Sequence, residues 1–278
     1  MIRQVVERIY TLVMDRPLKK GTVVAARYMI KRVLGMGSYG ISYVAWDLVN
    51  NVDVVLKQAR KTKIKMAKGK KAFEYEAKLL QILSHPNIPS LHEVIQNKQG
   101  HFLVMDYIQG DTFEDLIFRE GKSFSEREML NIVWSILDIT VYFHSQGIVH
   151  RDLRIPNILC VDGQIFIIDF GLARFLHDMP EEIDDGFIEK KLMREISVQS
   201  DIYALGHFML FLLYSGYEPT SLLEKSWEEE LNLSGDLTRI IRKMLQLDPP
   251  YETVESLRED MIHYLDGNEI GRKEDGII

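Results

Sequence analysis

The hydrophobic pattern changes its period part-way along this 278-residue chain, and this change constrains the fold more than any other feature. Between Arg27 and Lys57, apolar, β-branched and aromatic residues alternate with other residues, which predicts β-strands. From Asp111 onward, apolar residues recur at helical spacing. Ser125 to Glu128 forms a capping box, which predicts a long helix that ends near Gly147. We therefore expect an α+β fold with the strands first and the helices after them.

The same pattern indicates where the parts of the chain begin and end. A helix is expected over Phe73 to Leu83, a buried strand over Phe102 to Met105, and a hairpin turn at Asp162-Gly163. The stretch from Asp106 to Gly110 is the one that resembles a linker between domains. The expected regions are an amphipathic N-terminal helix extension (1–26), a strand-rich lobe (27–107), a helix-rich lobe (108–265) and a flexible tail (266–278).

Composition excludes several classes of protein. The formal net charge is -7, whereas nucleic-acid binders usually carry a net basic surface. The single cysteine, Cys160, cannot form an internal disulfide. The longest apolar run, from Ile202 to Tyr214, is too short to span a bilayer, and Arg3 and Glu7 interrupt the apolar residues of the first segment. We expect a soluble, cytoplasmic protein.

Three glycines point to a phosphate-binding hairpin. Gly35, Gly37 and Gly40 fit G-x-G-x-x-G, a pattern that is weak on its own and also fits a plain flexible hairpin. In a dinucleotide-binding fold this pattern should open a helix, but the residues from Ile41 to Trp46 alternate as a strand does. A glycine-rich hairpin between strands covers nucleotide phosphates, because backbone N–H groups must approach them closely.

A lysine follows this hairpin at the end of the next strand. Lys57 closes the run Val54-Val55-Leu56-Lys57, and its ammonium could hold the phosphates of a nucleotide. An anion must then orient it, and Glu76 on the following helix is the expected partner. Glu74 is a possible rival by position.

The stretch from His150 to Asn157 reads H-R-D-L-x-x-x-N, and Asp169-Phe170-Gly171 follows it. Together with the hairpin, Lys57 and Glu76, these motifs occur in the order typical of one family. From about Tyr28 to Leu265 the chain resembles the eukaryotic-like Ser/Thr protein kinases. The resemblance implies a two-lobed protein-kinase fold, with a small antiparallel-sheet N-lobe that has one main helix and a mostly helical C-lobe.

The resemblance also implies roles for individual residues. The expected catalytic residues are Asp152, Arg154, Lys57 and Glu76. ATP would contact Leu34, Gly35, Gly37, Gly40, Ser42, Val55, Lys57, Asp106, Ile108, Asn157 and Asp169. Mg²⁺, or Mn²⁺ in its place, would bind Asn157 and Asp169.

Further matches concern the core. Met105 would be the gatekeeper before the hinge, and the main chain of Asp106 and Ile108 would bind the adenine. Asp201 resembles the buried aspartate that braces the catalytic loop. The positions of the family's regulatory spine, which could equally be ordinary core, are Leu80, Leu91, His150 and Phe170.

The chain departs from the family in its activation segment. Of the A-P-E signature only Glu189 could be preserved, and the arginine that should pair with it is replaced by Glu252. No Ser, Thr or Tyr occurs from Leu172 to Ile196, so the usual activating phosphorylation cannot occur there. Arg151, which often grips that phosphate, is present. We hypothesise that the carboxylates of the segment replace the phosphate, unless they form a solvated acidic loop: Glu181, Glu182, Asp184 and Asp185.

These features predict a kinase that transfers the γ-phosphoryl group of ATP to Ser or Thr hydroxyls, without the usual activation-loop phosphorylation. Arg154, in place of the usual lysine, and the atypical segment favour a bacterial-type member. A pseudokinase scaffold and a small-molecule phosphotransferase are the alternatives, although the latter usually has glycine where Arg151 stands. The expected partner is a protein substrate, and docking could use the N-terminal helix or the basic stretch from Lys57 to Lys71.

Overall fold

The computed structural model describes the backbone of residues 14–37, 40–179, 188–219, 223 and 225–274, and side chains as far as Asp266. The contacts within the chain divide it into two compact units, residues 1–109 and 110–278. The sequence predicts this division two residues earlier, after residue 107. The predicted N-terminal amphipathic helix lies mostly outside the described residues.

The first unit contains a six-stranded antiparallel sheet with the order β1-β2-β3-β4-β6-β5. Its strands are β1 (Val23–Val24), β2 (Tyr28–Met36), β3 (Gly40–Asp47), β4 (Val52–Ala59), β5 (Leu91–Asn97) and β6 (Gly100–Asp106). The sequence predicts β2, β3, β4 and β6, whereas β1 and β5 are not predicted.

Strand register divides the side chains of this sheet between two faces. Lys57 on β4 lies opposite Ser42 on β3 and Leu103 on β6, so these three side chains share one face. Leu56 lies opposite Val104, on the other face. That second face forms a buried core, which consists of Val24, Tyr28, Ile30, Ile41, Tyr43, Ala45, Val54, Leu56, Ile95, Phe102 and Val104.

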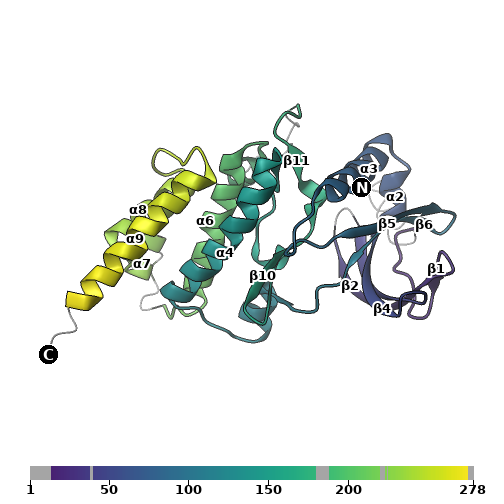
Figure 1. Ribbon diagram of the computed structural model, residues 1–278, viewed down its shortest axis with the longest axis horizontal. Coiled ribbons are helices and arrows are strands. Elements are labelled where there is room, and N and C mark those ends of the chain that lie inside the picture. The colour runs from purple at the N-terminus through teal and green to yellow at the C-terminus, as the bar shows by residue number, and fades with distance from the viewer. Residues whose placement is uncertain (1–13, 38–39, 180–187, 220–222, 224, 275–278) are drawn as a thin grey trace. The chain divides into compact units, whose positions relative to one another are not determined.

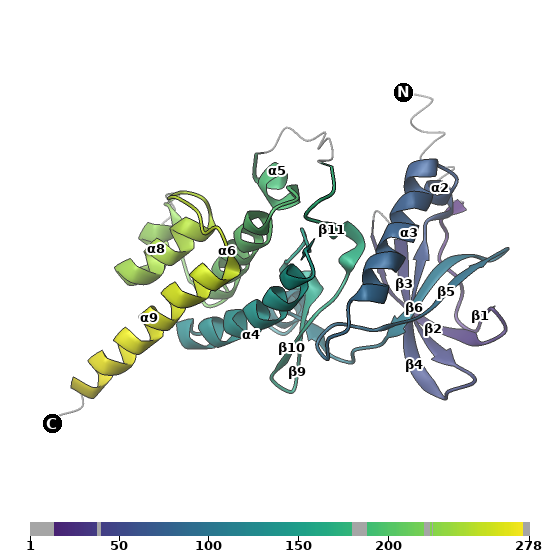
Figure 2. The ribbon, with the colours of Figure 1, turned by 45° about the horizontal axis from the view of Figure 1, so that its top comes forward.

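Two helices connect β4 to β5, the short α2 (Lys61–Ile64) and the longer α3 (Ala67–Ile82) (Figure 2). The sequence predicts the longer helix but places its start at Phe73. The earlier start is hard to predict because Met66, at the N-cap, makes no side-chain cap and the first turn contains a glycine, Gly69.

The second unit is mostly helical, and α4, α6 and α9 run side by side in it (Figure 1). The predicted capping box is confirmed: Ser125 Oγ accepts from Glu128 N, and Glu128 Oε2 accepts from Ser125 N. The helices are η1 (Asp115–Arg119), α4 (Glu126–Ser145), η2 (Ile155–Asn157), η3 (Phe170–Leu172), α5 (Ile188–Arg194), α6 (Val198–Tyr214), α7 (Trp227–Leu231), α8 (Gly235–Met244) and α9 (Val254–Glu274).

Short strands of the second unit carry the loops that matter for chemistry. The predicted hairpin is confirmed, because β9 (Ile158–Val161) and β10 (Gln164–Ile167) pair around Asp162 and Gly163. Both turn residues have positive φ, +48° and +82°, as a tight hairpin turn requires. The remaining strands are β7 (Asp111–Thr112), β8 (Ile148–Val149) and β11 (Arg174–Phe175).

The C-terminal end differs from the expectation of a loose tail from Asp266, because α9 continues as far as Glu274. Leu257, Met261 and Tyr264 are buried, so packing stabilises the first turns of this helix. Once a helix is nucleated, each further residue adds a hydrogen bond at a small cost, so polar residues can extend it. Within the described part of the chain, no helix is long and apolar enough to cross a membrane.

Candidate active site

The glycine-rich hairpin joins β2 to β3. A Cβ at Gly40 would lie 2.7 Å from the carbonyl oxygen of Gln58, so the close approach of β4 requires glycine there. Gly35 faces open space, and at Gly37 the nearest atom would be 4.0 Å away. Gly37 N donates to Gly40 O at 2.9 Å, while Ser38 and Tyr39 lie outside the described residues. Packing against β4 therefore explains why residue 40 is glycine. Beside Gly35 and Gly37 there is open space.

Lys57 and Glu76 form an ion pair in the first unit. Lys57 Nζ donates to Glu76 Oε1 at 2.5 Å, and both side chains are largely buried. Glu74, the rival considered above, lies instead on the exposed side of α3, 3.7 Å from Lys70. The ion pair holds the ammonium in one direction on the sheet face that also carries Ser42.

The other residues predicted to contact ATP in this unit lie around the same sheet face. Val55 lies opposite Met105, so both side chains are on the face of Lys57. Leu34 is 41% exposed, and Ile108 follows the end of β6 and is half-buried. The side chain of Asp106 points to the other face, where its carboxylate accepts from Ser90 N at 2.9 Å.

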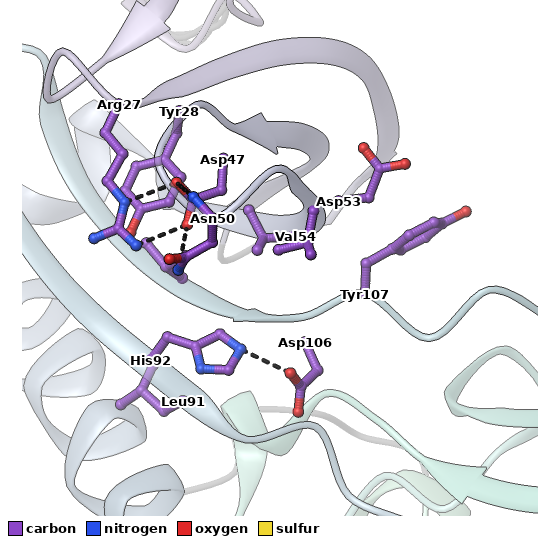
Figure 3. Close-up of a pocket in the computed structure, with 12 residues that line it drawn as sticks. Arg27, Tyr28, Asp47, Asn50, Asp53, Val54, Leu91, His92, Asp106 and Tyr107 are labelled. Atoms are coloured by element: carbon purple, nitrogen blue, oxygen red, sulfur yellow. Dashed lines mark hydrogen bonds and ion pairs between the residues drawn. The ribbon is translucent and has the colours of Figure 1, made fainter.

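A pocket of about 640 Å³ opens on that opposite face (Figure 3). Val54 and Val104 line it between two polar pairs: Arg27 with Asp47, and His92 with Asp106. The hydrogen bonds from Arg27 hold the pKa of the Asp47 carboxyl well below its usual range. Since neighbouring residues on a strand point to opposite faces, this pocket does not include the ammonium of Lys57.

In the second unit, two side chains of the H-R-D-L-x-x-x-N motif hold the carboxylate of Asp152. Arg154 makes two contacts with it, Nε to Oδ1 at 2.7 Å and Nη2 to Oδ2 at 3.2 Å. Asn157 Nδ2 donates to Oδ2 at 2.9 Å. The planar guanidinium can hold both carboxylate oxygens at once, which a lysine cannot do. The motif H-R-D-L-x-x-x-N thus brings Asp152, Arg154 and Asn157 together.

The oxygens of Asn157 and Asp169 suit a divalent cation. The Asn157 amide also donates to the main-chain oxygen of Asp152 at 2.9 Å, which leaves its own Oδ1 as an acceptor. Ile168 N donates to Asn157 O at 2.9 Å, and this bond brings Asp169 beside Asn157. Amide and carboxylate oxygens are the ligands that Mg²⁺ prefers. Asp169 has φ +63°, in the left-handed region that few non-glycine residues adopt.

A buried aspartate holds the start of the catalytic loop. Asp201 on α6 accepts from the backbone N–H groups of His150 and Arg151, at 2.8 and 2.7 Å, and from His144 Nε2 at 2.9 Å. Asp201 is completely buried, and Arg151 has φ +65°. Asp201 therefore has the bracing geometry that the sequence predicts.

Aromatic rings pack edge to face behind this loop. The rings of His150 and Phe170 have centroids 4.6 Å apart, and Phe143 lies 5.9 Å from Phe170. Burial lowers the pKa of His150, so this imidazole is neutral. In the first unit, Leu80 is buried and Leu91 is half-buried.

Arg151 joins the loop to the end of α5. Its Nε donates to Arg194 O at 2.7 Å, and its Nη1 donates to Leu172 O at 3.1 Å. The side chain of Arg194 extends to the catalytic loop, where Nη2 lies 3.2 Å from Asp152 Oδ1. Sequence reasoning missed Arg194, because a lone arginine at a helix end belongs to no motif.

The glutamate of the A-P-E signature is exposed in the part of the chain that the structure describes. Glu189 and Glu252 are both exposed, and neither makes an ion pair among the described residues. The acidic residues proposed to replace a phosphate, Glu181 to Asp185, lie outside those residues. Among the described residues, Arg151 and Arg194 connect the end of this segment to the catalytic loop.

The comparisons with known proteins agree with these features. Residues 28–267 match the family model described as "Protein kinase domain". A Bacillus subtilis protein described as "Probable serine/threonine-protein kinase YbdM" is 38% identical over 251 residues, which cover 90% of this chain and 94% of that protein.

Two longer bacterial proteins also match. Serine/threonine-protein kinase PrkC of Bacillus subtilis is 29% identical over 91% of this chain, and the match covers 43% of PrkC. Serine/threonine-protein kinase B of Synechocystis is 29% identical over 91% of this chain, and the match covers 48% of that protein. The chain belongs to the protein kinase family, and it is a serine/threonine protein kinase of the bacterial type.

Proposed function

We propose that the protein transfers the γ-phosphoryl group of ATP to Ser or Thr hydroxyls of a protein substrate, with the help of Mg²⁺. The observation that carries the proposal is the arrangement of Arg154 and Asn157 around the carboxylate of Asp152. Kinase catalysis consists mainly of positioning and charge stabilisation, and this cluster supplies a carboxylate for the acceptor hydroxyl and a cation beside it.

Each residue then has a defined task. Asp152 orients the acceptor hydroxyl and accepts its proton, while Arg154 places positive charge beside the transferred group. Lys57, oriented by Glu76, holds the phosphates of ATP. Bound Mg²⁺ would neutralise charge on those phosphates, and the oxygens of Asn157 and Asp169 would hold it.

The activation segment works without a phosphorylated residue in this proposal. Arg151, which would otherwise hold a phosphate, donates to the main-chain oxygens of Leu172 and Arg194. Acidic residues of the segment supply any further negative charge. Reversal of charge at Glu181, Glu182, Asp184 and Asp185 tests the second point, which unchanged phosphotransfer would contradict.

The identity of the acceptor separates this function from its alternatives. The test is transfer from γ-labelled ATP to the protein itself, to a basic protein and to a panel of small hydroxyl compounds, followed by phosphoamino-acid analysis. Phosphoserine or phosphothreonine is the expected product. Label on a small compound alone would indicate a small-molecule phosphotransferase, and ATP binding without transfer would indicate a pseudokinase.

The partner and the location follow from the reaction. A protein substrate must present its hydroxyl at Asp152, and the exposed lysines of α2 and α3 offer a docking surface for an acidic one. A cytoplasmic location is proposed because ATP is the donor.

A further inference from the structure

An arginine contacts the glycine-rich hairpin at Gly37. Arg60 follows directly after the end of β4, and its side chain turns back towards the β2–β3 hairpin. There Arg60 Nε donates to the main-chain oxygen of Gly37 at 2.8 Å. The same glycine donates to Gly40 O at 2.9 Å. Gly37 is thus held through both its N–H group and its carbonyl oxygen.

A buried carboxylate holds the arginine in turn. Asp15 Oδ2 lies 3.5 Å from Arg60 Nη1, and the Asp15 side chain is 1% exposed. The two oxygens of Asp15 also accept from Thr62 N at 3.1 Å and from Thr62 Oγ1 at 2.6 Å. These contacts cap α2, whose own N-cap residue, Arg60, supplies no side-chain cap. Asp15 therefore has a fixed position, and it limits the positions that Arg60 can take.

We propose that Arg60 is a positioning residue for the phosphate-binding hairpin, and that Asp15 sets its position. This inference rests on the proposed use of ATP. A glycine-rich hairpin has many conformations, of which few direct N–H groups to phosphates. The hydrogen bond from Arg60 to Gly37, called the tie below, reduces the number of hairpin conformations before ATP binds. Less conformational entropy is therefore lost on binding. The tie raises affinity for the nucleotide and leaves the chemical step unchanged.

The proposal gives a function to the segment that precedes the kinase-domain match at residue 28. Leu18, in the same segment, packs against the core of the sheet, and its N–H donates to Tyr43 Oη at 3.0 Å. Asp15 thus has a second anchor on the first unit three residues away. The segment reaches the hairpin through Arg60.

The geometry needs a guanidinium in particular. Arg60 uses Nε for Gly37 and Nη1 for Asp15, two donors in one rigid plane. A lysine has a single nitrogen and can serve one of these partners well. Lysine should therefore rescue only part of the function, whereas a role that needed charge alone would be fully rescued.

The experiment uses the full chain and five variants. Arg60→Gln removes the tie, Arg60→Lys keeps the charge, and Asp15→Asn keeps an acceptor that can cap α2 while removing the charge that faces Arg60. The double variant Asp15→Asn/Arg60→Gln completes the cycle. Lys31→Gln is the matched control, because Lys31 pairs with Asp53 on the same sheet and makes no described hydrogen bond or ion pair with residues 35–41.

Three quantities are measured for each variant: the Kd of a fluorescent ATP analogue, the KM for ATP with kcat, and hydrogen exchange of residues 35–41 without nucleotide. We expect Arg60→Gln and Asp15→Asn each to raise Kd and KM by about threefold to tenfold, the range of one ordinary hydrogen bond. Exchange of the hairpin should speed up, while kcat changes by less than about twofold. Arg60→Lys should lie between wild type and Arg60→Gln, and Lys31→Gln should match wild type.

The double variant tests whether Asp15 acts on the hairpin through Arg60. If Asp15 acts through Arg60, the double variant should bind the analogue no more weakly than the worse single variant. Wild-type Kd and exchange in Arg60→Gln, additive losses in the double variant, or full rescue by lysine would overturn the proposal. If wild type binds the analogue but transfers no phosphate, the proposed function fails, whereas the binding and exchange results still test the tie.

Discussion

Arg194, the last residue of α5, places Nη2 3.2 Å from Oδ1 of the catalytic-loop residue Asp152. The same oxygen accepts from Arg154 Nε, so two cations flank it. Asn157 donates to the other oxygen. An acceptor hydroxyl that approaches Oδ1 must therefore displace the side chain of Arg194.

Replacement of Arg194 by alanine should make peptide substrates bind more readily. The Nη1 atom of Arg194 is buried with no hydrogen-bond partner among the described residues, so the side chain is incompletely satisfied where it lies. An ion pair with a partly exposed partner contributes about 1 kcal/mol, so we expect the peptide KM to fall by about fivefold. The main-chain contact with Arg151 remains. A peptide KM that rises would instead assign Arg194 to substrate binding.

Loss of the Lys57–Glu76 ion pair should weaken the use of ATP. We expect Lys57→Met and Glu76→Gln each to lower kcat/KM for ATP by at least about tenfold, because the phosphates lose an oriented cation. Glu74→Gln is the matched control, since Glu74 is on the same helix and contacts only exposed Lys70 among the ion pairs described. Steady-state kinetics at varied ATP measure the effect, and equal losses in Glu74→Gln and Glu76→Gln would contradict it.

Asp201→Asn should destabilise the second unit. The carboxylate accepts three hydrogen bonds in a completely buried position, and an amide would direct its NH₂ at a donor. We expect a loss of about 2–4 kcal/mol in the free energy of unfolding, together with lower activity. Urea denaturation followed by circular dichroism measures it. An unchanged midpoint would show that the loop does not depend on this brace.

Stability should fall in mild acid, in part because of His150. Burial lowers its pKa in the folded state, whereas the unfolded chain titrates near pH 6.5. Below that pH the unfolded state binds more protons, so this contribution is present above about pH 6.5 and is lost as the pH falls. Between pH 7.5 and 5.5, His150→Phe should lose less stability than wild type in denaturant titrations. Equal losses would mean that His150 titrates normally.

Short-range signals in the sequence predict much of this structure. The capping box at Ser125 and the turn at Asp162-Gly163 depend on residues within one turn of each other, and both are confirmed. The contact between Asp152 and Asn157 is also short-range, because these residues are only five positions apart. Glu76 could be assigned as the partner of Lys57 because the family resemblance implies a glutamate at that position of the helix.

Contacts across longer distances left no such signal. Arg60 reaches Gly37 from 23 positions away, and Asp15 reaches Thr62 from 47. In the sequence, Arg60 is one of many cations in a basic stretch, and only packing shows that it faces the hairpin. Arg194 is a similar case, because its partner lies on a separate loop. The extent of α9 was missed because helix propagation depends on the packed turns before it.

The most direct test of the central claim compares phosphate transfer by wild type and by Asp152→Asn. The assay contains γ-labelled ATP, Mg²⁺ and a basic acceptor protein, and binding of ATP is measured in parallel. We predict that wild type labels serine or threonine, and that Asp152→Asn binds ATP with similar affinity but loses most of the transfer, because an amide cannot accept the hydroxyl proton. Undiminished transfer by Asp152→Asn would contradict the assignment of Asp152 as the catalytic carboxylate.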